Sequence, residues 1–143
     1  MALSDSEIRE SLTGESLVIA PFDESSLNPA GYDLRLSAEV ALAPSEHRLV
    51  ATMETVELGR DLVGILHIRS SLAREGILAS LSLVDPGFRG QLTISLFNSG
   101  RKTIQLKAGE RFVQLTLFRL GRQAAAKYEG RYQDSRGVVG SRR

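Results

Sequence analysis

The chain has 143 residues, a formal net charge of +1 and 42% hydrophobic residues, which suits one globular domain with its own core. It has no cysteine and two histidines, His47 and His67, which excludes a disulfide scaffold, a thiolate nucleophile and a Cys-based zinc site, and argues against a multi-histidine metal site. No signal-like region opens the chain and no stretch approaches the roughly 20 apolar residues of a membrane span, so we expect a cytoplasmic protein with no membrane partner.

A short helix is expected at the N-terminus, over residues 5–12. Ser4 and Glu7 have the spacing of a capping box, and an apolar stripe follows them. The apolar run at 17–20 then predicts a strand, and the stretch at 21–31, rich in Ser, Asn, Asp and Pro, predicts a loop.

The remainder of the chain up to residue 120 has the pattern of short strands separated by turns. Strands are expected at 32–36, 39–43, 63–68, 77–84, 92–97, 103–106 and 112–120. A weak helical signal covers 71–75. This pattern indicates an all-β sandwich or barrel rather than alternating β-α-β units, and we take residues 1–120 as one β domain.

The pattern changes in the C-terminal segment, 121–143, which we call the arm. Residues 124–128 have the composition of a turn of helix, and 130–143 are polar and glycine-containing, so we expect a mobile segment. From Arg119 to the end, seven Lys and Arg residues stand against two acids. Such a basic segment is a solvated tail, a nucleic-acid arm or a flap over an anionic ligand, and composition alone favours the tail.

Two polar clusters in the first half of the chain carry candidate chemistry. In the first, at 30–34, Asp33 follows a glycine at a strand start, where a solvated edge residue is the simpler interpretation. In the second, at 69–73, Arg69 stands beside two hydroxyl side chains at a possible helix start, which suits a phosphate. Taken alone, a helix cap with a surface arginine explains the second cluster equally well.

Two further clusters follow in the second half. Asp85 lies in a turn after an apolar strand, so its carboxylate is either a common turn former or a positioned general base for activating water. Phe88, three residues later, belongs to the core or lies against a flat sugar or base. The fourth cluster, at 109–114, begins with Gly-Glu, which suits an ordinary turn. In the simpler interpretation, Arg111 is a charge at a strand edge and Gln114 is a polar residue that faces outward.

Taken in order, the clusters AGYDL, RSSLA, VDPGFRGQ and GERFVQ resemble the motifs of the trimeric dUTPase and dCTP deaminase superfamily. The start at 3–5 and the end at 128–142 resemble the deaminase-like branch, so the resemblance covers nearly the whole chain. It implies a distorted β-barrel or jelly-roll-like fold with a short N-terminal helix. It also implies a homotrimer with its sites at subunit interfaces.

The resemblance leaves open which reaction of pyrimidine deoxynucleotide metabolism the chain carries out. dUTPases hydrolyse dUTP to dUMP and pyrophosphate, whereas the deaminases convert dCTP to dUTP. In the deaminases that this chain resembles, the strand after Asp-Pro-Gly carries a glutamate that shuttles protons. The corresponding residue here is Ser95, whose hydroxyl cannot replace a carboxylate in this role. We therefore favour dUTP hydrolysis. The alternatives are dCTP deamination, alone or in a bifunctional enzyme, and a non-enzymatic nucleotide-binding regulator.

A function in another class, the binding of RNA by a β-barrel, would need basic and aromatic residues on one strand face. The aromatic residues are scattered along the chain and the basic residues collect in the arm, so we expect no nucleic-acid partner.

The same resemblance assigns roles to single residues. Asp85 is expected to activate the attacking water, and Mg2+, bound mainly by the phosphate groups, is expected to contact Asp33 through water. The expected substrate-binding residues are Arg69, Ser70, Ser71, Phe88, Gln91, Gln114, Arg131, Gln133 and Arg136. The resemblance also implies that the arm closes over the triphosphate.

Overall fold

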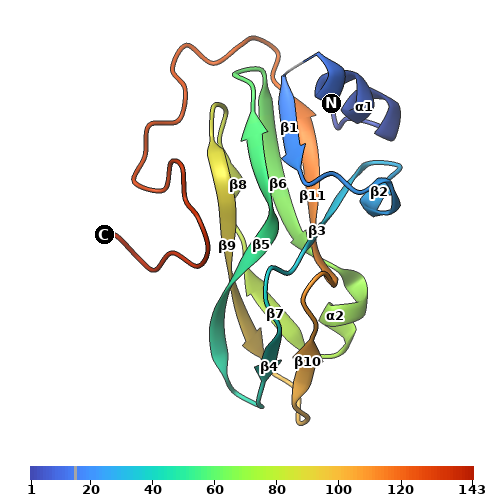
Figure 1. Cartoon of the computed structure of the whole chain (residues 1–143), viewed down its shortest axis with the longest axis vertical. Helices are drawn as coiled ribbons and strands as arrows, with labels where there is room; N and C mark the ends of the chain where they lie inside the picture. The colour runs from blue at the N-terminus through green and yellow to red at the C-terminus, as the bar shows by residue number, and fades with distance from the viewer. Residues whose placement is uncertain (15) are drawn as a thin grey trace.

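The computed structural model describes residues 1–14 and 16–143 and is built mainly of antiparallel strands (Figure 1). One sheet has the order β1 (Leu17–Ala20), β5 (His47–Leu58), β9 (Arg89–Asn98), β7 (Ile77–Ser80). A second has the order β2 (Leu27–Asn28), β3 (Gly31–Arg35), β11 (Arg111–Arg119), β6 (Leu62–Ile68), β8 (Leu83–Val84), and a small third sheet pairs β10 (Ile104–Leu106) with β4 (Val40–Leu42). The helical elements are α1 (Asp5–Thr13), α2 (Ser70–Arg74) and the 3-10 turn η1 (Glu24–Ser26).

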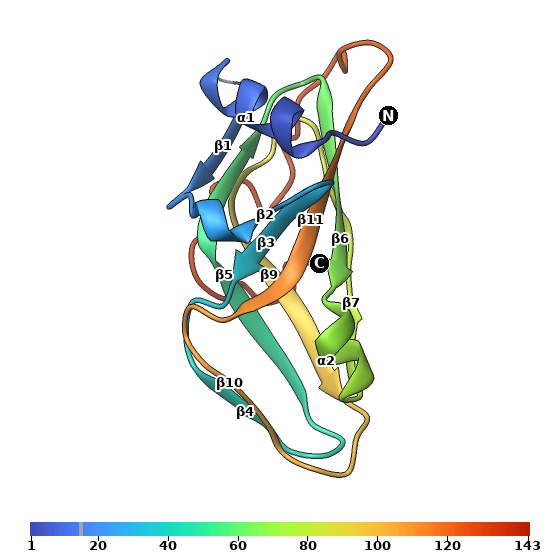
Figure 2. The same ribbon diagram turned by 90° about the vertical axis from the view of Figure 1, so that its right-hand side faces the viewer.

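The core is shared by the two larger sheets. Val56 and Ile94 come from the β5–β9 side, and Leu34 and Leu115 from the β3–β11 side, all of them at most 2% exposed. Each such side chain contributes about 1.5–3 kcal/mol by leaving water. The predicted all-β, jelly-roll-like class is confirmed, although among the described residues no sheet closes into a barrel: the layers are open, and the two-stranded β10–β4 sheet projects beyond them (Figure 2).

The N-terminal helix forms where its capping pattern predicts. The Ser4 hydroxyl accepts from the Glu7 backbone N–H, and the Glu7 carboxylate accepts from the Ser4 N–H at 2.8 Å. This reciprocal pair satisfies two of the four backbone donors that a helix start leaves without partners. Within residues 1–14 and 16–143, no helix has the length and apolar character needed to cross a membrane.

The longest strand, β5, was not predicted from the sequence. Its register against β9 shifts between Ala51 and Thr55, which breaks the alternation by which a strand is recognised, and its inward-facing positions include the charged Glu54. Two smaller predictions also need correction. The apolar run 77–84 forms two strands, β7 and β8, in different sheets, and residues 124–128 form no helix.

Two segments cover one edge of β9 in succession. β7 pairs with the end of β9, from Ser95 to Asn98. Nearer the start of β9 the arm takes the same edge: Gly90 forms a parallel bridge with Ser135, and the Gln91 N–H donates to the Ser135 carbonyl at 2.8 Å. The arm runs along this side of the molecule (Figure 1), so in the structure its second half is part of the hydrogen-bonded framework.

Candidate functional site

Apart from two arginines of the arm, the residues predicted for the site fall into two groups within one chain. The first, which we call the α2 cluster, comprises Asp33, Arg69, Ser70, Ser71 and Gln114. The second, which we call the turn cluster, comprises Asp85, Phe88, Gln91 and Gln133. The turn between β8 and β9 and the helix α2 lie toward opposite ends of the long axis in both views (Figures 1 and 2).

The α2 cluster is organised by an ion pair that joins β3 to the residue after β6, across the intervening strand β11. The Asp33 carboxylate, on β3, is 3% exposed and lies 3.1 Å from Nε of Arg69, which follows β6. β11 runs between these strands and places Gln114 opposite both Asp33 and His67. The pair leaves part of the Arg69 guanidinium in contact with solvent, beside the exposed Ser70 and Ser71 at the start of α2.

The donor groups near Asp33 do not form a metal cage by themselves. Across residues 1–14 and 16–143, no three His, Asp or Glu side chains gather closely enough to hold an ion. The Asp33 carboxylate is already neutralised by Arg69. Mg2+ keeps several waters and is commonly bound through substrate phosphates with one or two carboxylates. The residues present therefore fit an ion that arrives with a polyphosphate and do not fit a resident metal centre.

The turn cluster borders a cavity of about 450 Å³ between β9, the β8–β9 turn and the arm. Asp85 faces it from the turn and, in the described part of the chain, supplies its one carboxylate. Phe88 is 6% exposed and packs edge-to-face on Tyr128 of the arm, with ring centroids 5.6 Å apart. Tyr132, also from the arm, lines the same cavity. A carboxylate and aromatic rings around a space of this size suit an organic ligand with a polar reacting end.

The cavity also contains a polar pair, His47 and Ser95, that was not predicted from the sequence. His47, at the start of β5, has its Nε2 2.8 Å from the hydroxyl of Ser95 on β9. The two residues meet because the β5–β9 register places Leu49 opposite Ser95, and that pairing joins positions nearly fifty residues apart. The imidazole and the hydroxyl can each donate or accept a hydrogen bond, so the pair is able to contact either a carbonyl or an amino group of a ligand.

The side-chain amides of Gln91 and Gln133 are engaged with the chain's own backbone. Gln91 donates to the Thr52 carbonyl at 2.8 Å and accepts from the Gly137 N–H at 2.6 Å. Gln133 donates to the Gly87 carbonyl at 2.9 Å and accepts from the Arg89 N–H at the same distance. Both residues therefore hold the arm and the start of β9 together in this structure.

The two arginines predicted in the arm point to solvent. Arg131 is exposed and donates to the carbonyl of Arg142, so it makes its contact within the arm. Arg136 borders a smaller hollow of about 270 Å³, next to Arg89. Arg89 itself pairs with Asp134 at 2.5 Å, and this hydrogen bond lowers the pKa of Asp134 and raises that of Arg89.

The model of the dUTPase family matches residues 19–142. A protein named dCTP deaminase from Thermococcus gammatolerans is 44% identical, over 90% of this chain and 92% of its own length. A protein named probable deoxyuridine 5'-triphosphate nucleotidohydrolase, from Sulfolobus islandicus rod-shaped virus 1, is 35% identical over 97% of both chains.

Solved structures share the fold. The 2'-deoxycytidine 5'-triphosphate deaminase of Agrobacterium tumefaciens superposes with a TM-score of 0.72 at 20% identity, over 84% of this chain and 49% of that one. A mutant dUTPase from phage phi11 of S. aureus, described as coordinating a structural Mg(II) ion, superposes with a TM-score of 0.61 at 19% identity, over 81% of this chain and 98% of that one.

Proposed function

The chain belongs to the dUTPase family, and from that premise we propose that it hydrolyses dUTP to dUMP and pyrophosphate. The observation that carries this proposal is the cavity, whose one carboxylate within the described residues is Asp85. Hydrolysis of a phosphoanhydride bond needs a single general base near the attacking water, and Asp85 satisfies that requirement.

In the proposed reaction, Asp85 orients a water molecule and takes one of its protons. The water oxygen attacks the α-phosphorus in line with the bond to the bridging oxygen, that bond breaks, and pyrophosphate leaves. The carboxylate then returns its proton to solvent. Phe88 and its neighbours exclude water around the sugar, and Arg69 with the two hydroxyls of Ser70 and Ser71 binds phosphate oxygens.

Magnesium is proposed as part of the substrate. The triphosphate would carry the ion, which neutralises the phosphate charge when bound. Asp33, which pairs with Arg69, would contact the ion through a bridging water. This role matches the donor groups described above, which form no cage of their own among the described residues.

Deamination of dCTP is the second candidate. The name of the Thermococcus gammatolerans relative favours it, and His47 beside Ser95 offers an imidazole that can move a proton within the cavity. Against it stands the chemistry at position 95. Replacing the amino group by the oxygen of a water molecule moves both protons of that water, one to the ring nitrogen and one to the leaving ammonia, and the serine hydroxyl is a poor shuttle for them.

A direct product assay decides between the two reactions. With dUTP we expect pyrophosphate, and with dCTP we expect no ammonia, because the cavity holds one carboxylate among the described residues. The assay measures pyrophosphate and ammonia separately for each nucleotide in the presence of Mg2+. Ammonia from dCTP without pyrophosphate from dUTP would reject hydrolysis, and both products would indicate a bifunctional enzyme. Nucleotide binding with neither product would indicate a regulator.

We also propose that a complete site combines the α2 cluster of one subunit with the turn cluster of another, in a homotrimer. The separation of these clusters along the long axis supports this arrangement (Figures 1 and 2). A site shared across a cyclic interface leaves every protomer incomplete.

Complementation between two inactive variants tests the shared site. Arg69→Gln keeps a donor for Asp33 while removing the charge, and Asp85→Asn removes the base. When the two variants are co-expressed and assemble at random, about a quarter of the sites combine two intact clusters. We expect recovery of about that share of the wild-type rate. Each variant alone is the control, and a co-expressed mixture as inactive as its parents would place both clusters of a site in the same chain.

A further inference from the structure

The turn that carries Asp85 is bonded on both sides. Pro86 and Gly87 occupy its centre, Gly87 with a φ of +82°, and the Phe88 N–H donates to the Asp85 carbonyl at 3.0 Å. On the inner side, β5 holds the turn through Leu58: its carbonyl accepts from Gly87, and its N–H donates to the Phe88 carbonyl.

Among the described residues, no strand lies along the outer side of the same turn. β7 pairs with β9 only at Ser95–Asn98, so the carbonyl of Gly87 and the N–H of Arg89 face away from β5 without a β-ladder partner. A backbone group that is left unpaired away from water costs about as much as a lost hydrogen bond. Residues of the arm fill these positions.

One side chain of the arm bonds both groups. The amide of Gln133 donates from Nε2 to the Gly87 carbonyl at 2.9 Å and accepts at Oε1 from the Arg89 N–H, also at 2.9 Å. A side-chain amide carries both a donor and an acceptor, so one glutamine can bond a carbonyl and an N–H of the same segment. Gln133 thus bonds the turn as a neighbouring strand would.

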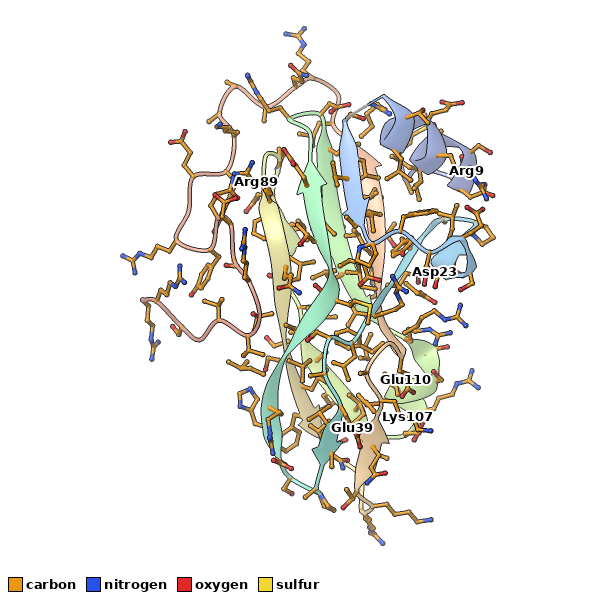
Figure 3. The ribbon with its side chains drawn as sticks, viewed as in Figure 1. Arg9, Asp23, Glu39, Arg89, Lys107 and Glu110 are labelled. Atoms are coloured by element: carbon orange, nitrogen blue, oxygen red, sulfur yellow. The ribbon has the colours of Figure 1, made fainter. Side chains whose placement is uncertain are left out.

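Main-chain groups on either side of Gln133 fix its position. The Tyr128 N–H donates to the Pro86 carbonyl at 2.8 Å, and the Asp134 N–H donates to the Arg89 carbonyl at 2.8 Å. The Asp134 carboxylate also pairs with the Arg89 side chain, and Figure 3 shows Arg89 at the upper end of β9 with the arm alongside. The arm therefore contacts the turn at successive residues from Pro86 to Arg89.

The hydrogen-bonding capacity of Gln133 argues against a phosphate contact. Its Nε2 has two hydrogens, which point to the carbonyls of Gly87 at 2.9 Å and Tyr128 at 3.3 Å. The remaining hydrogen-bonding capacity of the side chain is one lone pair on Oε1, which is an acceptor. A phosphate oxygen needs a donor, so the side chain cannot bind it in this position. The role expected from the resemblance would require this side chain to leave the turn.

We propose that Gln133 is a positioning residue: it clamps the Gly87–Arg89 backbone and thereby fixes the Asp85 carboxylate in the cavity. This inference rests on the proposed function for its kinetic consequence, whereas the clamp itself is a property of the free protein. A base held by a rigid turn needs no reorientation before it meets the water, and small misplacements of catalytic groups cost large factors in rate.

The experiment measures amide hydrogen exchange by NMR in the free protein, for Gln133→Ala and for the matched control Gln123→Ala, an exposed glutamine of the same arm. We expect exchange of the Arg89 amide to accelerate about tenfold in Gln133→Ala, the equivalent of one hydrogen bond, and to stay unchanged in the control. The Leu58 amide, which bonds the inner side of the turn, should stay protected in both variants and reports that the fold is intact.

Kinetics on the same variants separate positioning from substrate binding. A clamp predicts that kcat falls about tenfold or more with KM within about twofold of wild type. A phosphate contact predicts the reverse, a raised KM with an Arg89 amide that exchanges as in wild type, and this result would overturn the proposal. Gln133→Glu keeps an acceptor for Arg89 and loses the donor to Gly87, so it should protect the Arg89 amide more than alanine does.

Failure of the clamp and failure of the proposed function give different results. If the enzyme releases ammonia from dCTP and no pyrophosphate from dUTP, the proposed hydrolysis fails, yet accelerated Arg89 exchange in Gln133→Ala still supports the clamp. If pyrophosphate is the product and Arg89 exchange does not change, the clamp is wrong and the hydrolysis stands.

Discussion

Asp85→Asn should bind dUTP with nearly wild-type affinity and hydrolyse it about 10²- to 10⁴-fold more slowly. The substitution keeps the size and polarity of the side chain, so the turn and the cavity retain their shape. It removes the ability to take a proton from water, the function that Asp85 alone among the described residues of the cavity can supply as a carboxylate. Single-turnover pyrophosphate release and equilibrium binding of dUTP, measured on the same preparation, check both parts.

A carboxylate elsewhere on the surface is the matched control for Asp85. Glu39 is exposed and lies toward the lower end of the molecule, away from the β8–β9 turn (Figure 3). Glu39→Gln removes the same charge and should leave both turnover and binding unchanged. Turnover by Asp85→Asn at the rate of this control would remove Asp85 from the mechanism.

The second large effect is expected at a buried ion pair that connects two sheets. Glu54, on β5, has no exposed surface and accepts from Arg35 on β3 twice: from Nε at 2.6 Å and from the backbone N–H at 2.8 Å. Arg35 also reaches Asp23 at 3.1 Å and the carbonyl of Pro21. The hydrogen bond to Glu54 raises the pKa of Arg35.

Arg35→Met should lower the free energy of unfolding by about 3–5 kcal/mol, because it leaves the Glu54 carboxylate buried without its cation. Methionine fills similar space and removes the charge. The double variant Arg35→Met/Glu54→Met should recover most of the loss, since both charges are then absent. Urea unfolding at one fixed protomer concentration measures the two variants against wild type.

An exposed pair gives the comparison for Arg35. Arg119 pairs with Asp61 at the surface, and their side chains are 47% and 22% exposed. Arg119→Met should cost less than about 1 kcal/mol, because solvent screens such pairs. A loss for Arg35→Met no larger than for Arg119→Met would mean that the Glu54 carboxylate finds other partners when Arg35 is absent.

Local signals predicted those parts of the fold that local chemistry determines. The capping box at Ser4 needs only residues within one helical turn, and the turn at Asp85 needs only Pro86 and Gly87. The extent of β5 depends instead on a register shift against a strand forty residues away, and its buried Glu54 is stable only beside Arg35. Neither partner can be identified from the residues around β5.

The site divides in the same way. The order of the motifs predicts which residues form the site, including Arg69 and Asp85, and their roles stay predictions. The resemblance also implies sites at subunit interfaces, but which residues of one chain lie together depends on how the strands are arranged in space. His47 was missed because only the β5–β9 pairing brings it to Ser95. The contacts of Gln133 depend on where the arm docks, which its polar composition does not encode.

The docking of the arm on β9 also affects the tendency of separate protein molecules to aggregate. From Gly87 to Gln91 the turn and the start of this strand have backbone donors and acceptors along one side that β7 does not reach, and the arm bonds to them. Farther along, the arm bonds the side-chain hydroxyl of Thr93. An uncovered strand of this kind is a template on which chains of other molecules can add and aggregate. The same residues that hold the turn therefore protect the solubility of the protein, and an arm lost to proteolysis would remove both at once.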